Sequence, residues 1–329
     1  MKSKISNLIF TLIAIILAIV FIILTLRQTN FEALKSAAKN ANYFWFLVSV
    51  ILSIVSYWLR AARSTLLFEG INYNVSTKNG FWAISFGYFM NLTIPRSGEI
   101  ARATTLYRLE KIPVDKSIGT IVLERVIDLL FLALFFVLTF IFNAETLLSF
   151  FSFSEQPSLG KFILPIGVLV GVFTFFFLFR KSLNQFKLYQ KINVFLIGIW
   201  EGFKSILHLK NRGKFLLYSI GIWICYFLMT YLIVFAFPET AHFGLGEGFF
   251  LIVAGALGMI LPAVGGLGYP YIMSIAFAAI YVTQGQTAAE GKVVGNYFGL
   301  LLYFAQVIMM LLFGLLSILY INRNTQKIN

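Results

Sequence analysis

Long apolar runs, separated by short polar and basic segments, dominate the chain. A helix of about 20 apolar residues crosses the ~30 Å hydrocarbon core of a bilayer. Six runs have about this length, and they occupy residues 7–26, 44–68, 117–142, 162–179, 215–237 and 293–321. The first is longer than the ~7–15 apolar residues of a signal peptide and lacks a small-residue cleavage site, so we favour a span over the alternative of a cleaved signal. The pattern predicts an all-α, polytopic helical membrane protein with about six full spans.

Two further apolar segments are too short to cross a bilayer comfortably. They occupy residues 81–95 and 249–262, and each ends at a proline, Pro95 or Pro262, that is followed three residues later by a glycine. Proline lacks a backbone donor and stops a helix. We therefore expect two broken or re-entrant segments, which enter the membrane and return to the same side.

The two short segments resemble each other. Residues 80–98 and 248–265 align with one gap, and each segment lies between two full spans. This order occurs in the inverted repeats of many secondary transporters, whose sites lie near the midplane. A chance match between apolar sequences is the alternative. We expect one integral membrane domain over residues 1–329, with repeat 1 at about 44–142, a linker span and interfacial helix at about 143–213, and repeat 2 at about 214–321.

Composition agrees with this pattern, and charge adds an orientation. Of the 329 residues 59% are hydrophobic and only 12% are charged, against about a quarter charged in soluble domains. The net charge is +13, and the basic residues lie between the apolar runs. In that position they suit contact with anionic lipid headgroups better than binding of nucleic acid. If both short segments turn back, the loops on the side of the termini hold 18 Lys and Arg residues and the opposite loops hold 5. Since such residues collect in cytoplasmic loops, we expect a cell (inner) membrane protein with both termini in the cytoplasm.

The polar connections offer little other chemistry. Residues 185–209 place apolar residues at helical spacing between lysines, which predicts a helix lying on the inner leaflet. His208 on this helix has no nearby partner and is expected to be interfacial. Cys225 is the single cysteine and lies in an apolar run, so the chain offers no intrachain disulfide and no metal-site spacing. We expect no cofactor and no metal site.

Ionisable side chains within the apolar runs require partners, because each costs at least ~2.5–3.5 kcal/mol in hydrocarbon. Glu124 and Asp128 are four residues apart and share one face of a predicted helix, with Arg125 about 100° away. These charges form either a substrate site or internal salt bridges that clamp the first re-entrant segment. Arg60 and Arg63 lie one turn apart near the inner end of their span, where we expect them to reach the headgroups.

The first break combines a helix start with a cation. Pro95 interrupts the segment, and Ser97 is positioned to cap a helix that begins at Gly98. The N-terminal end of that helix favours an anion. Arg96 stands beside it, and a guanidinium suits bidentate phosphate binding. We expect Arg96, Gly98 and Arg102 to engage an anionic headgroup, with Glu99 one turn before Arg102.

Three motifs together carry a family resemblance. They are Asn91-x-x-x-Pro95-Arg-Ser-Gly-Glu99-x-x-Arg102, then Glu124-Arg-Val-Ile-Asp128, and then Pro262-x-x-Gly265-Gly266-Leu-Gly268. In this order they resemble the flippase-like transmembrane region of lysylphosphatidylglycerol synthases. The resemblance spans most of the chain and implies a multi-pass membrane protein associated with lipid translocation. The glycines of the third motif are expected to allow close backbone packing.

Two departures from that family change the expected function. The synthases carry a cytoplasmic aminoacyl-transfer domain after the membrane part, whereas this chain ends at Asn329, so we expect no synthesis of aminoacyl lipid. In many members an acidic residue closely follows the Gly-Gly-x-Gly element. Here Tyr269, Pro270 and Tyr271 follow it, which puts the usual substrate in doubt.

We therefore expect a flippase-like protein, and no enzyme, that binds or translocates an anionic or modified phospholipid or a lipid-linked headgroup. One alternative is a membrane-embedded enzyme acting on lipid phosphates, with Glu99 or Asp128 as the base, although no His or metal cluster completes such a site. Another is a non-transporting accessory protein for envelope assembly. The expected partner is a membrane lipid and not nucleic acid, and the oligomeric state stays open.

Overall fold

The computed structural model describes residues 29–94, 97–151, 209–260 and 268–325. Within these residues the protein is helical and has no strand, which confirms the all-α fold class. The helices in chain order are α2 (Phe31–Asn40), α3 (Tyr43–Glu69), α4 (Thr77–Thr93), α5 (Gly98–Glu110), α6 (Val114–Phe142), α7 (Ala144–Phe151), α11 (Arg212–Tyr231), the 3₁₀ helix η1 (Leu232–Ala236), α12 (Leu245–Ile260), α13 (Gly268–Thr283) and α14 (Ala288–Thr325).

Four helices of the described part are long and apolar enough to cross a membrane, namely α3, α6 with α7, α11 with η1, and α14. They match the predicted spans at 44–68, 117–142, 215–237 and 293–321. Their outer faces carry large apolar side chains, such as Leu129, Ile308 and Leu319, that are more than half exposed and suit contact with lipid. The predicted spans at 7–26 and 162–179, and the predicted interfacial helix at 185–209 with His208, lie outside the described residues.

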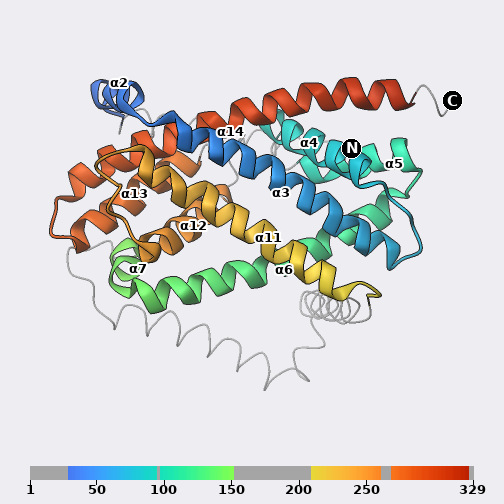
Figure 1. Ribbon diagram of the computed structural model, residues 1–329, viewed down its shortest axis with the longest axis horizontal. Coiled ribbons are helices and arrows are strands. Elements are labelled where there is room, and N and C mark those ends of the chain that lie inside the picture. The colour runs from blue at the N-terminus through green and yellow to red at the C-terminus, as the bar shows by residue number, and fades with distance from the viewer. Residues whose placement is uncertain (1–28, 95–96, 152–208, 261–267, 326–329) are drawn as a thin grey trace, which may run out of the picture.

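The two short apolar segments each begin a pair of packed helices. Helix α4 packs against α5, and α12 packs against α13. Figure 1 shows these two pairs toward opposite ends of the long axis, along which α3, α6, α11 and α14 run. Residues 95–96 and 261–267 lie outside the described residues, and with them Pro95, Arg96, Pro262, Gly265 and Gly266.

A close backbone approach holds the first pair together. Helix α5 begins at Gly98, as predicted, and a Cβ atom added to Gly87 of α4 would lie 2.7 Å from the Gly98 carbonyl oxygen. The Asn91 side chain accepts a 2.8 Å hydrogen bond from the Gly98 amide and thereby caps α5. Ser97 occupies the N-cap position but makes no capping bond, because its hydroxyl donates to the carbonyls of Met90 and Ile94. The sequence therefore predicted the helix start correctly and the capping side chain wrongly.

The helix pairing has an internal regularity. Helix α3 packs against α11, α4 packs against α14, and α12 packs against α6. Suppose that α3, α4 and α6 of the first unit correspond to α11, α12 and α14 of the second. Exchanging the two units then leaves the pair α3 and α11 unchanged, and it turns the pair α4 and α14 into the pair α12 and α6. This is the arrangement that a two-fold relation between repeats produces. The inverted repeat stays a proposal, which this pairing supports.

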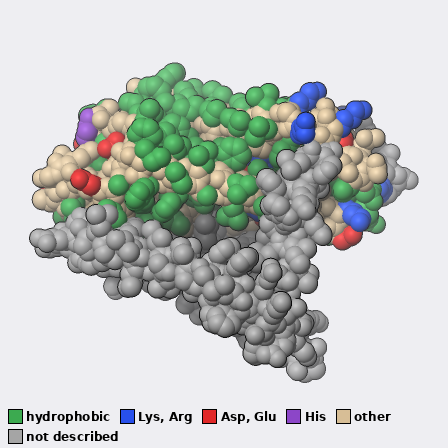
Figure 2. Space-filling model, turned by 90° about the horizontal axis from the view of Figure 1, so that it is seen from below, with side chains coloured by type: hydrophobic (Ala, Val, Ile, Leu, Met, Phe, Trp, Pro, Cys, Tyr) green, Lys and Arg blue, Asp and Glu red, His purple; other side chains and the backbone are tan. Residues whose placement is uncertain are grey.

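Charged and apolar side chains occupy different parts of the surface. In the view of Figure 2, hydrophobic side chains cover the middle of the molecule, and Lys and Arg gather toward one end. That end holds the start of α11, with Arg212 and Lys214, and the C-terminal part of α5, with Arg108. An apolar belt between polar ends is the surface of a protein that spans a bilayer.

Candidate functional site

A buried glutamate forms the centre of the charge cluster. Glu124 of α6 is 0% exposed and accepts two hydrogen bonds from Arg102 of α5, at 2.8 Å from Nη1 and 2.7 Å from Nη2. Arg60 and Arg63 of α3 each place Nη2 3.9 Å from Glu124 Oε2. The Arg102 Nη2 group also donates to the Ser64 hydroxyl at 2.8 Å. One carboxylate thus faces three guanidinium groups from two helices that lie far apart in the sequence.

Asp128 links this buried cluster to the protein surface. Its Oδ1 atom accepts a 2.8 Å hydrogen bond from Arg63, and its Oδ2 atom accepts a 3.3 Å hydrogen bond from Arg125. Arg125 also contacts a second carboxylate, because its Nε atom donates a 3.1 Å hydrogen bond to Glu99. The Glu99 side chain is 52% exposed, so this outer pair contributes little to stability.

The cluster has an excess of positive charge and of donors. In the described part of the chain it contains four guanidinium groups, on Arg60, Arg63, Arg102 and Arg125, and three carboxylates. One positive charge is therefore unbalanced. The buried Nε atoms of Arg60, Arg63 and Arg102 find no hydrogen-bond partner among the described residues. Buried donors of this kind favour an additional acceptor at the site.

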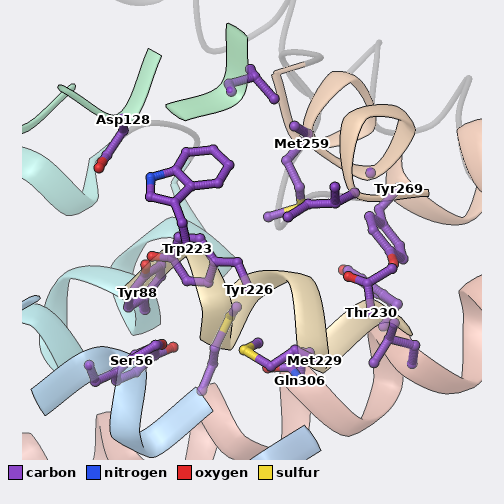
Figure 3. Close-up of a pocket in the computed structure, with 18 of the residues that line it drawn as sticks. Ser56, Tyr88, Asp128, Trp223, Tyr226, Met229, Thr230, Met259, Tyr269 and Gln306 are labelled. Atoms are coloured by element: carbon purple, nitrogen blue, oxygen red, sulfur yellow. The ribbon is translucent and has the colours of Figure 1, made fainter. Parts of the chain in front are cut away.

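A cavity of about 540 Å³ opens beside the cluster. Its lining is mostly apolar and comes from all the long helices and both helix pairs, with Arg125, Asp128, Tyr88 and Tyr226 among its polar residues. Figure 3 shows Asp128 and Trp223 on one side of the cavity, with Thr230 and Tyr269 on the other. The apolar walls include Leu129, Leu132, Ile252, Met259, Leu302, Val307 and Met310. A cavity with one charged end and apolar walls has the amphiphilic character of a lipid.

Comparison with known proteins identifies the family. The model for the lysylphosphatidylglycerol synthase TM region matches residues 11–314. The chain belongs to this family. Membership confirms the resemblance drawn from the three motifs and establishes a multi-pass integral membrane protein.

The relatives include two proteins that are described as UPF0104 membrane proteins. A UPF0104 membrane protein of Methanocaldococcus jannaschii is 27% identical over 186 residues, which cover 53% of this chain and 54% of the relative. A UPF0104 membrane protein of Pyrococcus horikoshii is 21% identical over 297 residues, which cover 82% of this chain and 86% of the relative. The first match thus spans about half the length of that relative. No solved structure matches this chain.

In this member of the family, the predicted site residues take two different places. Arg102 and Glu124 lie buried against each other, whereas Arg125 and Asp128 line the cavity. Glu99 lies outside the buried cluster, although the sequence places it one turn from Arg102. The second helix pair supplies no charged group to the cluster within the described residues, and Gly268 begins α13 as a buried residue.

The expectation for Arg60 and Arg63 was wrong. Both side chains are buried, at 4% and 0% exposed, and they turn inward toward Glu124 and Asp128 instead of reaching the headgroups. The physical reason is charge balance. Two carboxylates on the facing helix α6, Glu124 and Asp128, stabilise the buried guanidinium groups of Arg60 and Arg63, and snorkelling would break these ion pairs.

The sequence analysis missed the neutral polar residues in and beside the cavity, of which Ser56 and Gln306 line it. Gln306 lies within the apolar run of α14 and accepts a 2.8 Å hydrogen bond from Ser53 of α3. Ser49, Ser53 and Ser56 recur along α3 at helical spacing and are all buried. A polar stripe of this kind within an apolar span was the available signal, since buried polar groups in a bilayer seek one another.

Proposed function

We propose that this protein binds and translocates an anionic phospholipid or a lipid-linked anionic headgroup, and that it acts as a transporter and not as an enzyme. The observation that carries this proposal is the cavity of about 540 Å³, whose apolar walls end at Arg125 and Asp128 beside a cluster with surplus positive charge. The name of the family, with its synthase membrane region, supports a role in lipid metabolism or transport.

The cavity has dimensions that suit part of a lipid. Small-molecule sites commonly have volumes of about 300–1,000 Å³, and this cavity lies within that range. In our proposal the headgroup lies near Arg125, and the first part of an acyl chain lies along Leu132, Leu302 and Met310. The rest of the lipid extends into the bilayer.

Two predicted ligands have different roles in this proposal. Arg102 donates two hydrogen bonds to Glu124, so these donors are not available to a lipid. Arg102 therefore supports the site by holding α5 against α6. Arg96 lies outside the described residues and remains proposed as a headgroup ligand beside the start of α5. In this proposal the carboxylates of Glu124 and Asp128 neutralise the arginines and do not bind substrate.

The proposed orientation follows from the basic end of the molecule. In the view of Figure 2, Lys and Arg gather, together with some acidic groups, at the end that includes Arg108, Arg212 and Lys214, whereas the opposite end shows acidic groups and His242. Because basic residues collect on the cytoplasmic side, we propose that this end and both termini face the cytoplasm of a cell membrane.

The contacts of Asp128 argue against the enzyme alternative. A general base needs an accessible lone pair and a raised affinity for protons. Both carboxylate oxygens of Asp128 already accept hydrogen bonds from arginines, Oδ1 from Arg63 and Oδ2 from Arg125, so neither oxygen is free to take a proton from a substrate. Glu99 is half exposed and paired with Arg125, away from the buried cluster.

Reconstitution into liposomes tests the proposal. Purified protein is incorporated into vesicles that carry trace fluorescent phosphatidylglycerol, phosphatidylethanolamine or a neutral glycerolipid, and an impermeant quencher reports exchange between leaflets. We expect exchange of the anionic lipid above that of protein-free vesicles. Ala256→Trp places a large ring in the cavity from α12 and should abolish exchange.

A variant outside the cavity supplies the control. Leu319→Trp adds a ring on a side chain of α14 that is 66% exposed, so it should leave exchange unchanged. Equal exchange by Ala256→Trp and Leu319→Trp would show that this cavity is not the path of the lipid. Equal exchange of all three lipids would contradict the proposed anionic substrate.

A further inference from the structure

Three tyrosine hydroxyl groups converge at the charged end of the cavity. Tyr57 of α3 and Tyr88 of α4 stack with their ring centroids 4.5 Å apart and an interplanar angle of 12°. Tyr226 of α11 lies near the same point, since Arg60 contacts the hydroxyls of both Tyr88 and Tyr226. All three tyrosines line the cavity. Figure 3 shows Tyr88, Tyr226 and Ser56 on the side away from Tyr269.

Arg60 fixes the direction of two of these hydroxyl groups. Its Nη1 atom donates to the Tyr88 oxygen and, at 3.5 Å, to the Tyr226 oxygen. A guanidinium group has only donors, so each hydroxyl must accept from it and must direct its own hydrogen elsewhere. No protein acceptor for either hydrogen exists among the described residues. Tyr88 and Tyr226 are therefore donors toward the cavity, polarised by a buried cation.

The third hydroxyl lacks any partner. The Tyr57 side chain is 4% exposed, and its hydroxyl has no hydrogen bond within the part of the chain that the structure describes. A buried hydroxyl without a partner is unfavourable, and native proteins leave few of them. The position of Tyr57 on the cavity wall makes a ligand oxygen its available acceptor.

The surrounding charges favour an anion at this point. Within the described residues Arg60 forms one ion pair, with Glu124 at 3.9 Å, and that carboxylate is hydrogen-bonded to Arg102 instead. Asp128 also faces the cavity, but Arg63 and Arg125 hold its two oxygens. The unbalanced positive charge of the cluster therefore lies next to the three hydroxyls, in surroundings of low dielectric constant.

We propose that the hydroxyls of Tyr57, Tyr88 and Tyr226 form a subsite for the phosphate of an anionic lipid, with Arg60 as the positioning residue behind them. This inference rests on the proposed function, because it assigns the headgroup end of the lipid cavity. A phosphodiester carries one negative charge and equals the surplus of the cluster. It also brings the apolar chains that the cavity walls accommodate, which inorganic phosphate lacks.

Lipid binding in neutral detergent provides the test. Wild-type protein is titrated with dioleoylphosphatidylglycerol, with dioleoylglycerol, which has the same chains and no phosphate, and with inorganic phosphate. Native mass spectrometry gives the affinities. We expect at least a tenfold preference for the phospholipid. The double variant Tyr88→Phe with Tyr226→Phe keeps both rings and should lose about tenfold or more of its phospholipid affinity. Its affinity for dioleoylglycerol should stay unchanged.

Matched variants keep the result specific. Tyr231→Phe removes a hydroxyl from the same helix as Tyr226, but that hydroxyl donates to the Phe243 carbonyl outside the cavity. It should keep the full preference. Tyr57→Phe should weaken phospholipid binding without a loss of melting temperature, since its hydroxyl has no protein partner to lose.

Three outcomes overturn the inference. The first is an unchanged preference for phospholipid in the double variant, and the second is an equal loss of preference in Tyr231→Phe. The third is displacement of phospholipid by an equal concentration of inorganic phosphate, which would make a free anion the ligand.

Failure of the proposed function would be seen in a different measurement. A wild-type protein that prefers phosphatidylglycerol but moves no lipid in vesicles would leave the subsite standing and remove translocation. Translocation by a protein whose preference for phospholipid does not depend on the tyrosines would support the proposed function and remove the subsite.

Discussion

Arg102 and Glu124 meet through two parallel hydrogen bonds, Nη1 to Oε2 at 2.8 Å and Nη2 to Oε1 at 2.7 Å, in a place where neither side chain exceeds 5% exposure. This two-point contact joins the short helix α5 to the membrane span α6. Arg60 and Arg63 approach the same carboxylate from α3. A single carboxylate thus connects the helix pair α4 and α5 to the spans α3 and α6.

Loss of the Glu124 charge should destabilise the protein strongly. Glu124→Gln leaves three buried guanidinium groups facing a neutral amide, and breaking a buried ion pair commonly costs about 3–5 kcal/mol. We expect a lower yield and a clearly lower melting temperature in detergent. Glu99→Gln is the matched control, because its exposed pair with Arg125 contributes less than about 1 kcal/mol. Equal melting temperatures of the two variants would show that Glu124 is not the anchor of the cluster.

A methyl group at Gly87 should separate the first helix pair. In Gly87→Ala the new Cβ atom would lie 2.7 Å from the Gly98 carbonyl, so α4 and α5 must move apart, at a cost of about 1–3 kcal/mol. Gly119→Ala serves as the control. No heavy atom lies within 4 Å of its added Cβ atom, and alanine favours a helix by about 1 kcal/mol over glycine. Melting temperatures should fall for the first variant and stay or rise for the second, and the opposite order would contradict the close packing.

The planar group of Arg96 should matter for lipid handling more than for folding. Arg96→Lys keeps the charge and loses the bidentate fork, so we expect weaker headgroup binding and slower exchange at unchanged yield. The exposed Arg108 at the end of α5 supplies the control, since Arg108→Lys should be silent in the same liposome assay. Arg60 does not serve as a silent control, because the structure buries it within the cluster. If Arg96→Lys were fully active, the headgroup would need only a point charge there.

Chemical labelling tests the orientation. In a Cys225→Ala background, Lys214→Cys at the basic end and Gln286→Cys in the loop between α13 and α14 give exposed thiols at opposite ends. In intact cells an impermeant thiol reagent should modify only Gln286→Cys. Lys214→Cys should react after permeabilisation. Labelling of both from the same side would contradict the proposed topology and with it the inverted repeat.

The sequence by itself determined the four spans that the structure describes and the positions where their neighbouring helices stop. The apolar runs at 44–68 and 117–142 correspond to α3 and α6, and Gly98 begins α5 as predicted. These features are local. The number of apolar residues that crosses a bilayer, and the stop that a proline imposes, depend on residues close together in the chain. The same local spacing placed Glu124 and Asp128 on one helix face, and Arg63 contacts both.

Only the tertiary structure decided which charges meet and where the cavity lies. Arg60 and Arg63 come from a helix some sixty residues before Glu124. From helical spacing alone, lipid headgroups were the only partners that could be predicted for them. Tyr88, Tyr226 and Gln306 belong to α4, α11 and α14, so no motif unites them. Their meeting depends on how helices pair across the bundle. That choice follows from the packing of whole helix faces and from the need of each buried charge for a counter-charge, which no short window of sequence contains.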